Sequence, residues 1–169
     1  MSEEVTSPGG ARAGRWVLLA YRIPREPSRP RIAVWRTLER LGVARLGDGL
    51  VSLPADARTR ERLEWVAEEV TDNGGTATIW LAEPTSVAQE RQIATALRLA
   101  RAAEYQAVAE QAQAARDGDT GEQARAARRL RGELRRINQR DYFPPPERDA
   151  ARLAVQELAD QAARDGVRS

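Results

Sequence analysis

A change of composition at Glu83-Pro84 divides the sequence into two parts. Before it, short apolar runs alternate with Pro and Gly; after it, Ala, Arg, Gln and Glu predominate. The first pattern is typical of a mixed domain of strands and helices, and the second of helices that pack through small residues. We therefore expect a domain over residues 15–84 and a helical extension over 85–169. Residues 1–14 are acidic and have no apolar run, so they are predicted to be a disordered lead-in.

The first part has the signals of four strands and two helices. Its first run, Trp16–Tyr21, is apolar on both alternating faces, as in a central strand that is covered on both sides. Gly47-Asp48 favours a hairpin turn, and Asp56 can cap a helix. The expected elements are a strand at 15–23, a helix from the N-cap Ser28 to Gly42, strands at 43–46 and 49–53, a helix from Asp56 to Asn73-Gly74-Gly75, and a strand at 76–82. This order predicts an α+β fold with a ferredoxin-like βαββαβ domain, in which both helices lie on one face of an antiparallel sheet.

Apolar spacing indicates which side of the first helix faces the sheet. Val34, Leu38 and Leu41 fall at i, i+4 and i+7, and Ile32 and Trp35 widen this stripe. In the second helix the stripe consists of Leu63, Val66, Ala67 and Val70.

The opposite face of the sheet carries Trp80 and half of the apolar first strand, so we infer that something covers it. For the four tryptophans and Tyr21, core packing is a better explanation than stacking on nucleic-acid bases.

The second part predicts three helices, at 86–116, 120–140 and 146–165, which makes the extension about three helices long. They are separated by Asp117-Gly118-Asp119 and by Phe143–Pro146. Each has a narrow apolar seam: Ile93, Leu97 and Ala100; Ala127, Leu130, Leu134 and Ile137; Ala151, Val155, Leu158 and Ala162. Such seams suit contacts between helices in a hairpin or bundle, which could pack on the sheet, on itself or on a second subunit.

The composition excludes most catalytic chemistry. The chain has no Cys and no His, and all 27 of its basic side chains are arginine. Thiolate nucleophiles, Ser-His-Asp triads, Schiff-base lysines and structural zinc sites are therefore excluded. Glu68-Glu69 is a carboxylate pair, but no other groups converge on it. We expect no enzyme activity, no metal and no cofactor.

The net charge of +2 does not describe a strongly basic protein, so any binding of nucleic acid must come from local clusters of arginine. No apolar run approaches the roughly 20 residues that span a membrane. We therefore expect a cytoplasmic protein that does not bind membranes.

Two arginine clusters stand out. Arg22, Arg25, Arg29 and Arg31 lead from the first strand into the first helix. Guanidinium groups near a helix N-terminus can bind an oxyanion or a phosphate, although a solvated loop has the same composition.

The second cluster lies on the middle helix of the extension. Arg128, Arg131 and Arg135 share one face by their i, i+3, i+7 spacing and could follow a phosphate backbone. The simpler alternative is a solvated face that also holds Glu122 and Glu133.

Six segments carry a resemblance to a known family: Trp16–Pro24, Arg31–Gly42, Gly47–Pro54, Glu64–Glu69, Gly74-Gly75 and Arg140–Pro144. In this order they resemble the N-terminal domain of the ChrB chromate-resistance proteins, over nearly the whole chain from residue 15. The resemblance implies a regulator of an efflux operon that binds DNA, senses an oxyanion, or both. Full-length members carry a further C-terminal domain, so we expect the sensing part to be missing here or supplied by another protein.

A more distant likeness is to the ferredoxin-like nuclease subunit of CRISPR adaptation and to PaaX-type repressors, which pair as dimers. The nuclease pattern ends its first strand in Tyr-Asp-Ile-Pro, with the Asp holding the metal. This chain reads Tyr21-Arg22-Ile23-Pro24, and an arginine repels a metal ion.

The resulting hypothesis is a ChrB-like regulatory protein, a homodimer that binds double-stranded DNA, chromate or another oxyanion through the two arginine clusters. The alternative is a non-catalytic dimerisation or assembly module with no DNA binding of its own.

Overall fold

The computed structural model describes residues 14–168, and these fall into two compact units. Unit 1 is Met1–Ile93 and unit 2 is Ala94–Ser169. The predicted lead-in at 1–14 lies outside the described residues except for Gly14.

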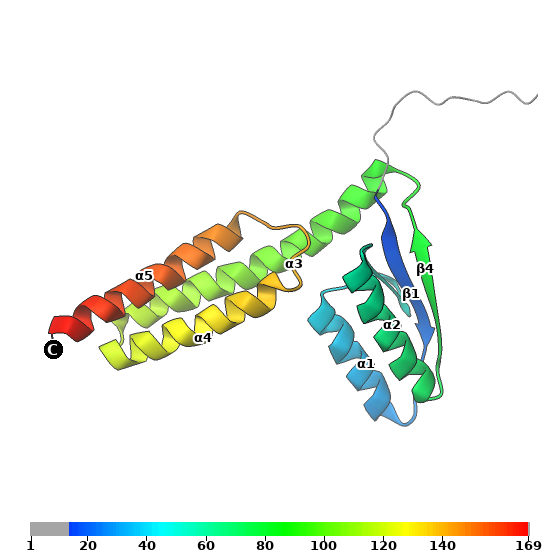
Figure 1. Cartoon of the computed structure of the whole chain (residues 1–169), viewed down its shortest axis with the longest axis horizontal. Coiled ribbons are helices and arrows are strands. Elements are labelled where there is room, and N and C mark those ends of the chain that lie inside the picture. Colours follow the sequence, from blue (N-terminus) through cyan, green and yellow to red (C-terminus); the bar gives the residue numbers. More distant parts are fainter. Residues whose placement is uncertain (1–13, 169) are drawn as a thin grey trace, which may run out of the picture. The chain divides into compact units, whose positions relative to one another are not determined.

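Unit 1 contains a four-stranded antiparallel sheet (Figure 1). Its strands are β1 (Trp16–Arg22), β2 (Ala44–Gly47), β3 (Leu50–Pro54) and β4 (Thr76–Ala82), in the spatial order β2-β3-β1-β4. The apolar run of β1 is central, between β3 and β4, as predicted. The prediction of an α+β fold is confirmed.

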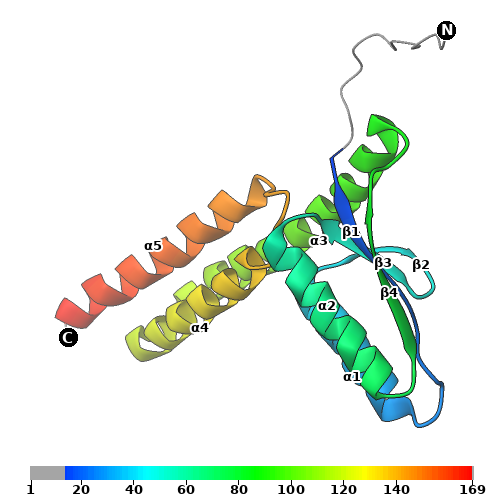
Figure 2. The same ribbon diagram turned by 45° about the vertical axis from the view of Figure 1, so that its right-hand side comes forward.

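Two helices, α1 (Ser28–Leu41) and α2 (Ala57–Asp72), lie side by side on one face of this sheet (Figure 2). Strand register assigns Val17 and Leu19 to that face, opposite Leu53 and Val51 of β3. The predicted helix stripes meet them there, since Val34, Leu38, Leu63, Val66 and Val70 are all buried. Burial of each such side chain contributes about 1.5–3 kcal/mol, so this interior is the main source of stability in unit 1.

Local signals explain where the elements begin and end. Asp56 accepts a hydrogen bond from the Thr59 backbone N–H at 2.7 Å, so the predicted cap of α2 is present. Gly42 ends α1 at φ 69°, as expected. The predicted cap of α1 is wrong by one residue, because Pro27 is the N-cap and Ser28 is the first helical residue.

The hairpin turn is also displaced by one residue from the prediction, to Asp48-Gly49. Gly49 has φ 69°, and a Cβ there would lie 2.3 Å from the Tyr21 carbonyl oxygen. The turn therefore requires glycine at its second position.

Three tryptophans correct the expectation of core packing. Trp35, Trp65 and Trp80 are 50%, 62% and 56% exposed, and only Trp16 is buried. Ile32, expected to widen the stripe of α1, is 44% exposed. The reason is that Val34 and Leu38 already fill the contact between α1 and the sheet, which leaves the flanking positions of the helix outside.

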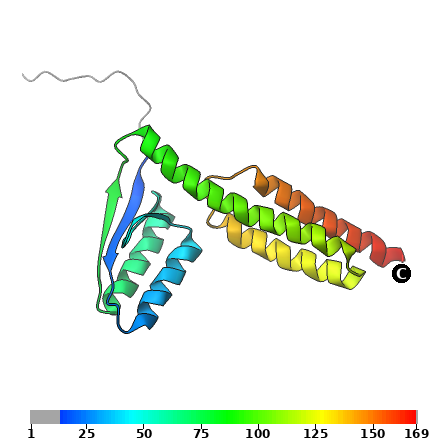
Figure 3. The same ribbon diagram turned by 180° about the vertical axis from the view of Figure 1, so that it is seen from behind.

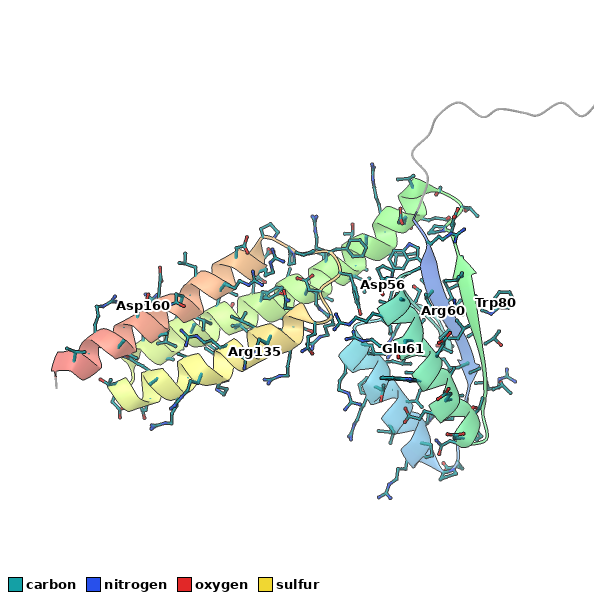
Figure 4. The ribbon with its side chains drawn as sticks, viewed as in Figure 1. Asp56, Arg60, Glu61, Trp80, Arg135 and Asp160 are labelled. Atoms are coloured by element: carbon teal, nitrogen blue, oxygen red, sulfur yellow. The ribbon has the colours of Figure 1, made fainter. Side chains whose placement is uncertain are left out.

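The second face of the sheet is covered at one end. Trp16 and Ser52 are buried there, and the Trp16 indole N–H donates to the Glu90 carboxylate of α3 at 3.1 Å. Trp80, on the same face, points away from β4 into the open (Figure 4). The inference that the whole face is covered is therefore wrong at Trp80.

The second part of the chain is helical, with α3 (Val87–Ala114), a 3-10 turn (Ala115–Asp117), α4 (Thr120–Asn138) and α5 (Glu147–Arg168). The first two turns of α3 belong to unit 1. In unit 2 the helices run alongside one another (Figure 3) and share one buried core. The predicted seam of α5 is buried throughout, and in α4 only Leu134 is partly exposed. In the predicted seam of α3, Leu97 is buried but Ala100 is exposed, so the prediction is wrong at Ala100. Further along α3, Tyr105, Val108 and Ala112 belong to the shared core.

Candidate functional site

The four arginines of the first cluster lie around the start of α1. Arg22 ends β1, Arg25 is in the connection, and Arg29 and Arg31 are in the first turns of α1. All four are exposed, and among the described residues none of them forms an ion pair. The start of α1 has no acidic residue and no side-chain cap. Its open N–H groups and macrodipole favour an anion there.

A groove of about 880 Å³ lies between the end of β1, the start of α1 and the β2–β3 hairpin. We call it the hairpin groove. Its lining residues are Tyr21, Arg22, Ile23, Arg31, Ile32, Trp35, Arg45, Leu46, Gly47, Asp48 and Gly49. It brings together Arg22 and Arg31 of the predicted cluster, while Arg25 and Arg29 do not line it.

Arg45 of β2 is the third arginine of the groove, and the sequence analysis did not single it out. Its guanidinium forms an ion pair with Glu39 at 2.8 Å and lies 6.0 Å from the centre of the Trp35 ring. Both partners hold the side chain beside the groove. Since Arg45 follows α1 by only a few residues, the helix–turn–strand order was the available signal for its proximity.

The charges of the groove lining favour an anion. The lining contains three arginines, Arg22, Arg31 and Arg45, and one carboxylate, Asp48. Arginine forks bind tetrahedral oxyanions through paired N–H donors, and two such forks suffice for a dianion. The groove is open to solvent, so any such site would be sensitive to salt.

The second cluster lies on α4. Arg128, Arg131 and Arg135 are all exposed, and among the described residues none of the three forms an ion pair. Arg131 donates to the Gln156 side chain at 3.4 Å. Arg128 and Arg131 flank a shallow hollow of about 300 Å³ between α4 and α5, whose floor consists of alanines. Arg135 (labelled in Figure 4) continues the same helix face.

A polar network in unit 2 escaped the sequence analysis. Glu104 of α3 forms ion pairs with Arg101 at 3.1 Å and with Arg140 at 2.6 Å. Beside it, the Tyr105 hydroxyl donates to Asp141 at 2.9 Å. Burial, followed by the hydrogen bond to Asp141, raises the pKa of Tyr105 well above its ordinary value.

This network joins α3 to the connection that follows α4, at the start of the segment Arg140–Pro144. Its acids and bases are engaged with one another, which indicates a structural role for that segment. The sequence does show the adjacent Arg140 and Asp141 before a proline-rich break. Their partners, Glu104 and Tyr105, could not be identified from it because they lie 36 residues earlier in the chain.

No group of three or more acidic, His or Cys residues in the described part could hold a metal ion. None of the described helices is long and apolar enough to cross a membrane.

Comparison with known proteins gave one match. The family model described as "Protein ChrB, N-terminal" matches residues 31–165, which is most of the chain. The matched region includes Arg31, Arg45 and the arginines of α4. No curated protein and no solved structure matches the chain.

Proposed function

The chain belongs to the ChrB N-terminal family, and from this membership we propose that it is a regulatory protein of chromate resistance. It binds DNA through the α4 arginines and an oxyanion in the hairpin groove, and it has no catalytic role. The observation that carries the proposal is the hairpin groove, whose lining contains three arginines and one carboxylate.

The fold of unit 1 is proposed to be ferredoxin-like. Its antiparallel order β2-β3-β1-β4 supports this, together with one helix after β1 and one after β3. In this arrangement the hairpin groove lies at the β2 edge of the sheet, and the start of α1 forms one of its walls.

Chromate is the oxyanion that the family membership suggests. It is a tetrahedral dianion, and Arg22 and Arg31 offer guanidinium groups that no described carboxylate occupies. Arg45 is held by Glu39 and Trp35, so it would add positive potential more than a new hydrogen bond.

DNA binding is proposed for α4, because Arg128, Arg131 and Arg135 form a row of exposed guanidinium groups that pair with no described carboxylate. Neutralisation of phosphates by such a row releases counterions, so affinity should fall steeply with salt.

The test is fluorescence anisotropy with double-stranded DNA from the protein's own upstream region, at two salt concentrations, with and without chromate. We expect salt-sensitive binding that chromate weakens. The triple variant Arg128→Gln, Arg131→Gln, Arg135→Gln should reduce the salt slope by about 3. The matched control removes three other exposed arginines, Arg36, Arg40 and Arg58, and should have a much smaller effect.

The double variant Arg22→Gln, Arg31→Gln separates the two sites. It should still bind DNA but no longer respond to chromate. Equal loss of DNA binding in the α4 triple and in its control would contradict the assignment to α4. Absence of binding at low salt would overturn DNA binding altogether and leave an assembly module as the function.

A further inference from the structure

The two edges of the sheet in unit 1 differ in how open they are to pairing. Strands β2 and β4 are the outer strands, so each has a row of backbone N–H and C=O groups with no neighbouring strand among the described residues. Such a row is a template for another strand unless the edge is blocked.

The β2 edge is blocked in several ways. The strand has four residues, carries the charged Arg45, and shifts register between Arg45 and Gly47 where a bulge interrupts its ladder with β3. Short length, charge and bulges are the features that prevent edge-to-edge pairing in native sheets.

The β4 edge has none of these features. It is seven residues long, Thr76–Ala82, and pairs with β1 in unbroken register. It contains no charged residue, proline or glycine, and β-branched and aromatic residues predominate in it. On its two faces, Trp80 and Leu81 are 56% and 53% exposed.

We infer that a second copy of this chain pairs with the outer edge of β4, antiparallel and about a two-fold axis, so that the two sheets become one. An identical strand suits this edge, because each copy supplies the same uncharged surface and no like charges meet within the strand. Pairing would satisfy the open backbone groups and cover part of the exposed Trp80 on one face and of the exposed Leu81 on the other. This surface is separate from the hairpin groove and from α4.

Symmetry adds a specific requirement. Directly opposed residues of an antiparallel pair lie on the same face of the sheet, so in two identical strands one residue must oppose its own copy. That residue marks the two-fold axis.

The first test is sedimentation velocity of the full chain over a range of concentrations. Wild type should be a dimer, and the double variant Trp80→Lys, Leu81→Lys should dissociate at least roughly tenfold more readily. The matched control is Trp35→Lys, Leu46→Lys, which changes one exposed Trp and one exposed Leu elsewhere in unit 1. Circular dichroism checks that each variant is folded.

A monomeric wild type at about 100 µM would overturn the inference. A dimer that survives the β4 variant but not the control would overturn it as well. Neither outcome bears on DNA or chromate binding, which are measured separately.

The second test uses the absence of native cysteine. Single cysteines are introduced one at a time from Ala77 to Leu81, with Leu46→Cys as the control, and the protein is mildly oxidised. Opposed Cα atoms in such a pair are about 4.5–5.5 Å apart, within disulfide range. One position should crosslink far more than its neighbours; crosslinking no greater than the control at every position would overturn the pairing.

Discussion

Units 1 and 2 reach a buried interior by different means. In unit 1 the interior consists of large Leu and Val side chains between a sheet and two helices. In unit 2, four of the ten buried core residues are alanine, and a buried alanine removes less apolar surface from water than a Leu or Val does. Polar pairs such as Tyr105–Asp141 and Arg140–Glu104 add to its cohesion. We conclude that unit 1 depends on packing volume, whereas unit 2 depends in addition on directional bonds.

The chain is suited to measuring this difference, because all four tryptophans are in unit 1. Tryptophan fluorescence therefore reports the unfolding of unit 1. Far-UV circular dichroism receives much of its signal from the long helices of unit 2.

The largest effect is expected for Leu63→Ala in α2. Leu63 is fully buried, and the cavity left behind should lower the free energy of unfolding of unit 1 by about 3 kcal/mol. In denaturant titrations, the fluorescence midpoint should fall while the dichroism of unit 2 changes less. Equal shifts of both midpoints would show that the two units unfold together. The difference in their interiors would then not give them separate stabilities.

An intermediate effect is expected for Tyr105→Phe. It removes the hydrogen bond to Asp141 from a buried site and should cost about 1–2 kcal/mol in the free energy of unfolding. The expected result is the opposite of that for Leu63→Ala: the unfolding midpoint followed by circular dichroism should fall, and the midpoint followed by tryptophan fluorescence should stay the same.

The same tyrosine gives unit 2 a pH dependence. Its pKa is raised in the folded state, so its contribution to stability is complete below pH 10 and is lost as pH rises beyond that value. The chain has no Lys and no Cys side chains, so tyrosines are the main side chains that titrate there. Thermal unfolding at pH 8 and pH 11 should show a greater loss for wild type than for Tyr105→Phe. A loss of equal size in both would contradict this origin.

The smallest effect is expected for Ser52→Ala in β3, and its sign is reversed. The Ser52 hydroxyl is buried and has no hydrogen-bond partner among the described residues. Its removal should leave unit 1 unchanged or stabilise it by up to about 1 kcal/mol, measured by fluorescence. A clear destabilisation would show that the hydroxyl has a partner, such as an ordered water.

Local chemistry explains why much of the fold could be predicted. Strand β4 was predicted at its observed bounds, since alternation and the glycines before it leave little choice. Asp56 and Gly42 act through their immediate neighbours, so their positions in the sequence were sufficient. Helical periodicity located the seams of α4 and α5 for the same reason.

What escaped prediction depends on residues far apart in the chain. Periodicity places Trp35 beside the stripe of α1 but does not reveal that the hairpin, and not the sheet, lies opposite it. For the same reason, the sequence did not reveal that Arg22 and Arg31 line the groove whereas Arg25 and Arg29 do not. The partners Tyr105 and Asp141 have no periodic signature, because a polar pair needs only one contact.

Because β2 contains a bulge, the shape of the hairpin groove depends on the number of residues in this strand. Leu46 is the extra residue between Arg45 and Gly47, and such an insertion bends its strand. Deletion of Leu46 would let the ladder run on regularly and straighten the hairpin that forms one wall of the groove. Between the two glycines that the backbone requires, Gly42 and Gly49, the segment should therefore be more sensitive to a change of length than to substitution of its exposed side chains.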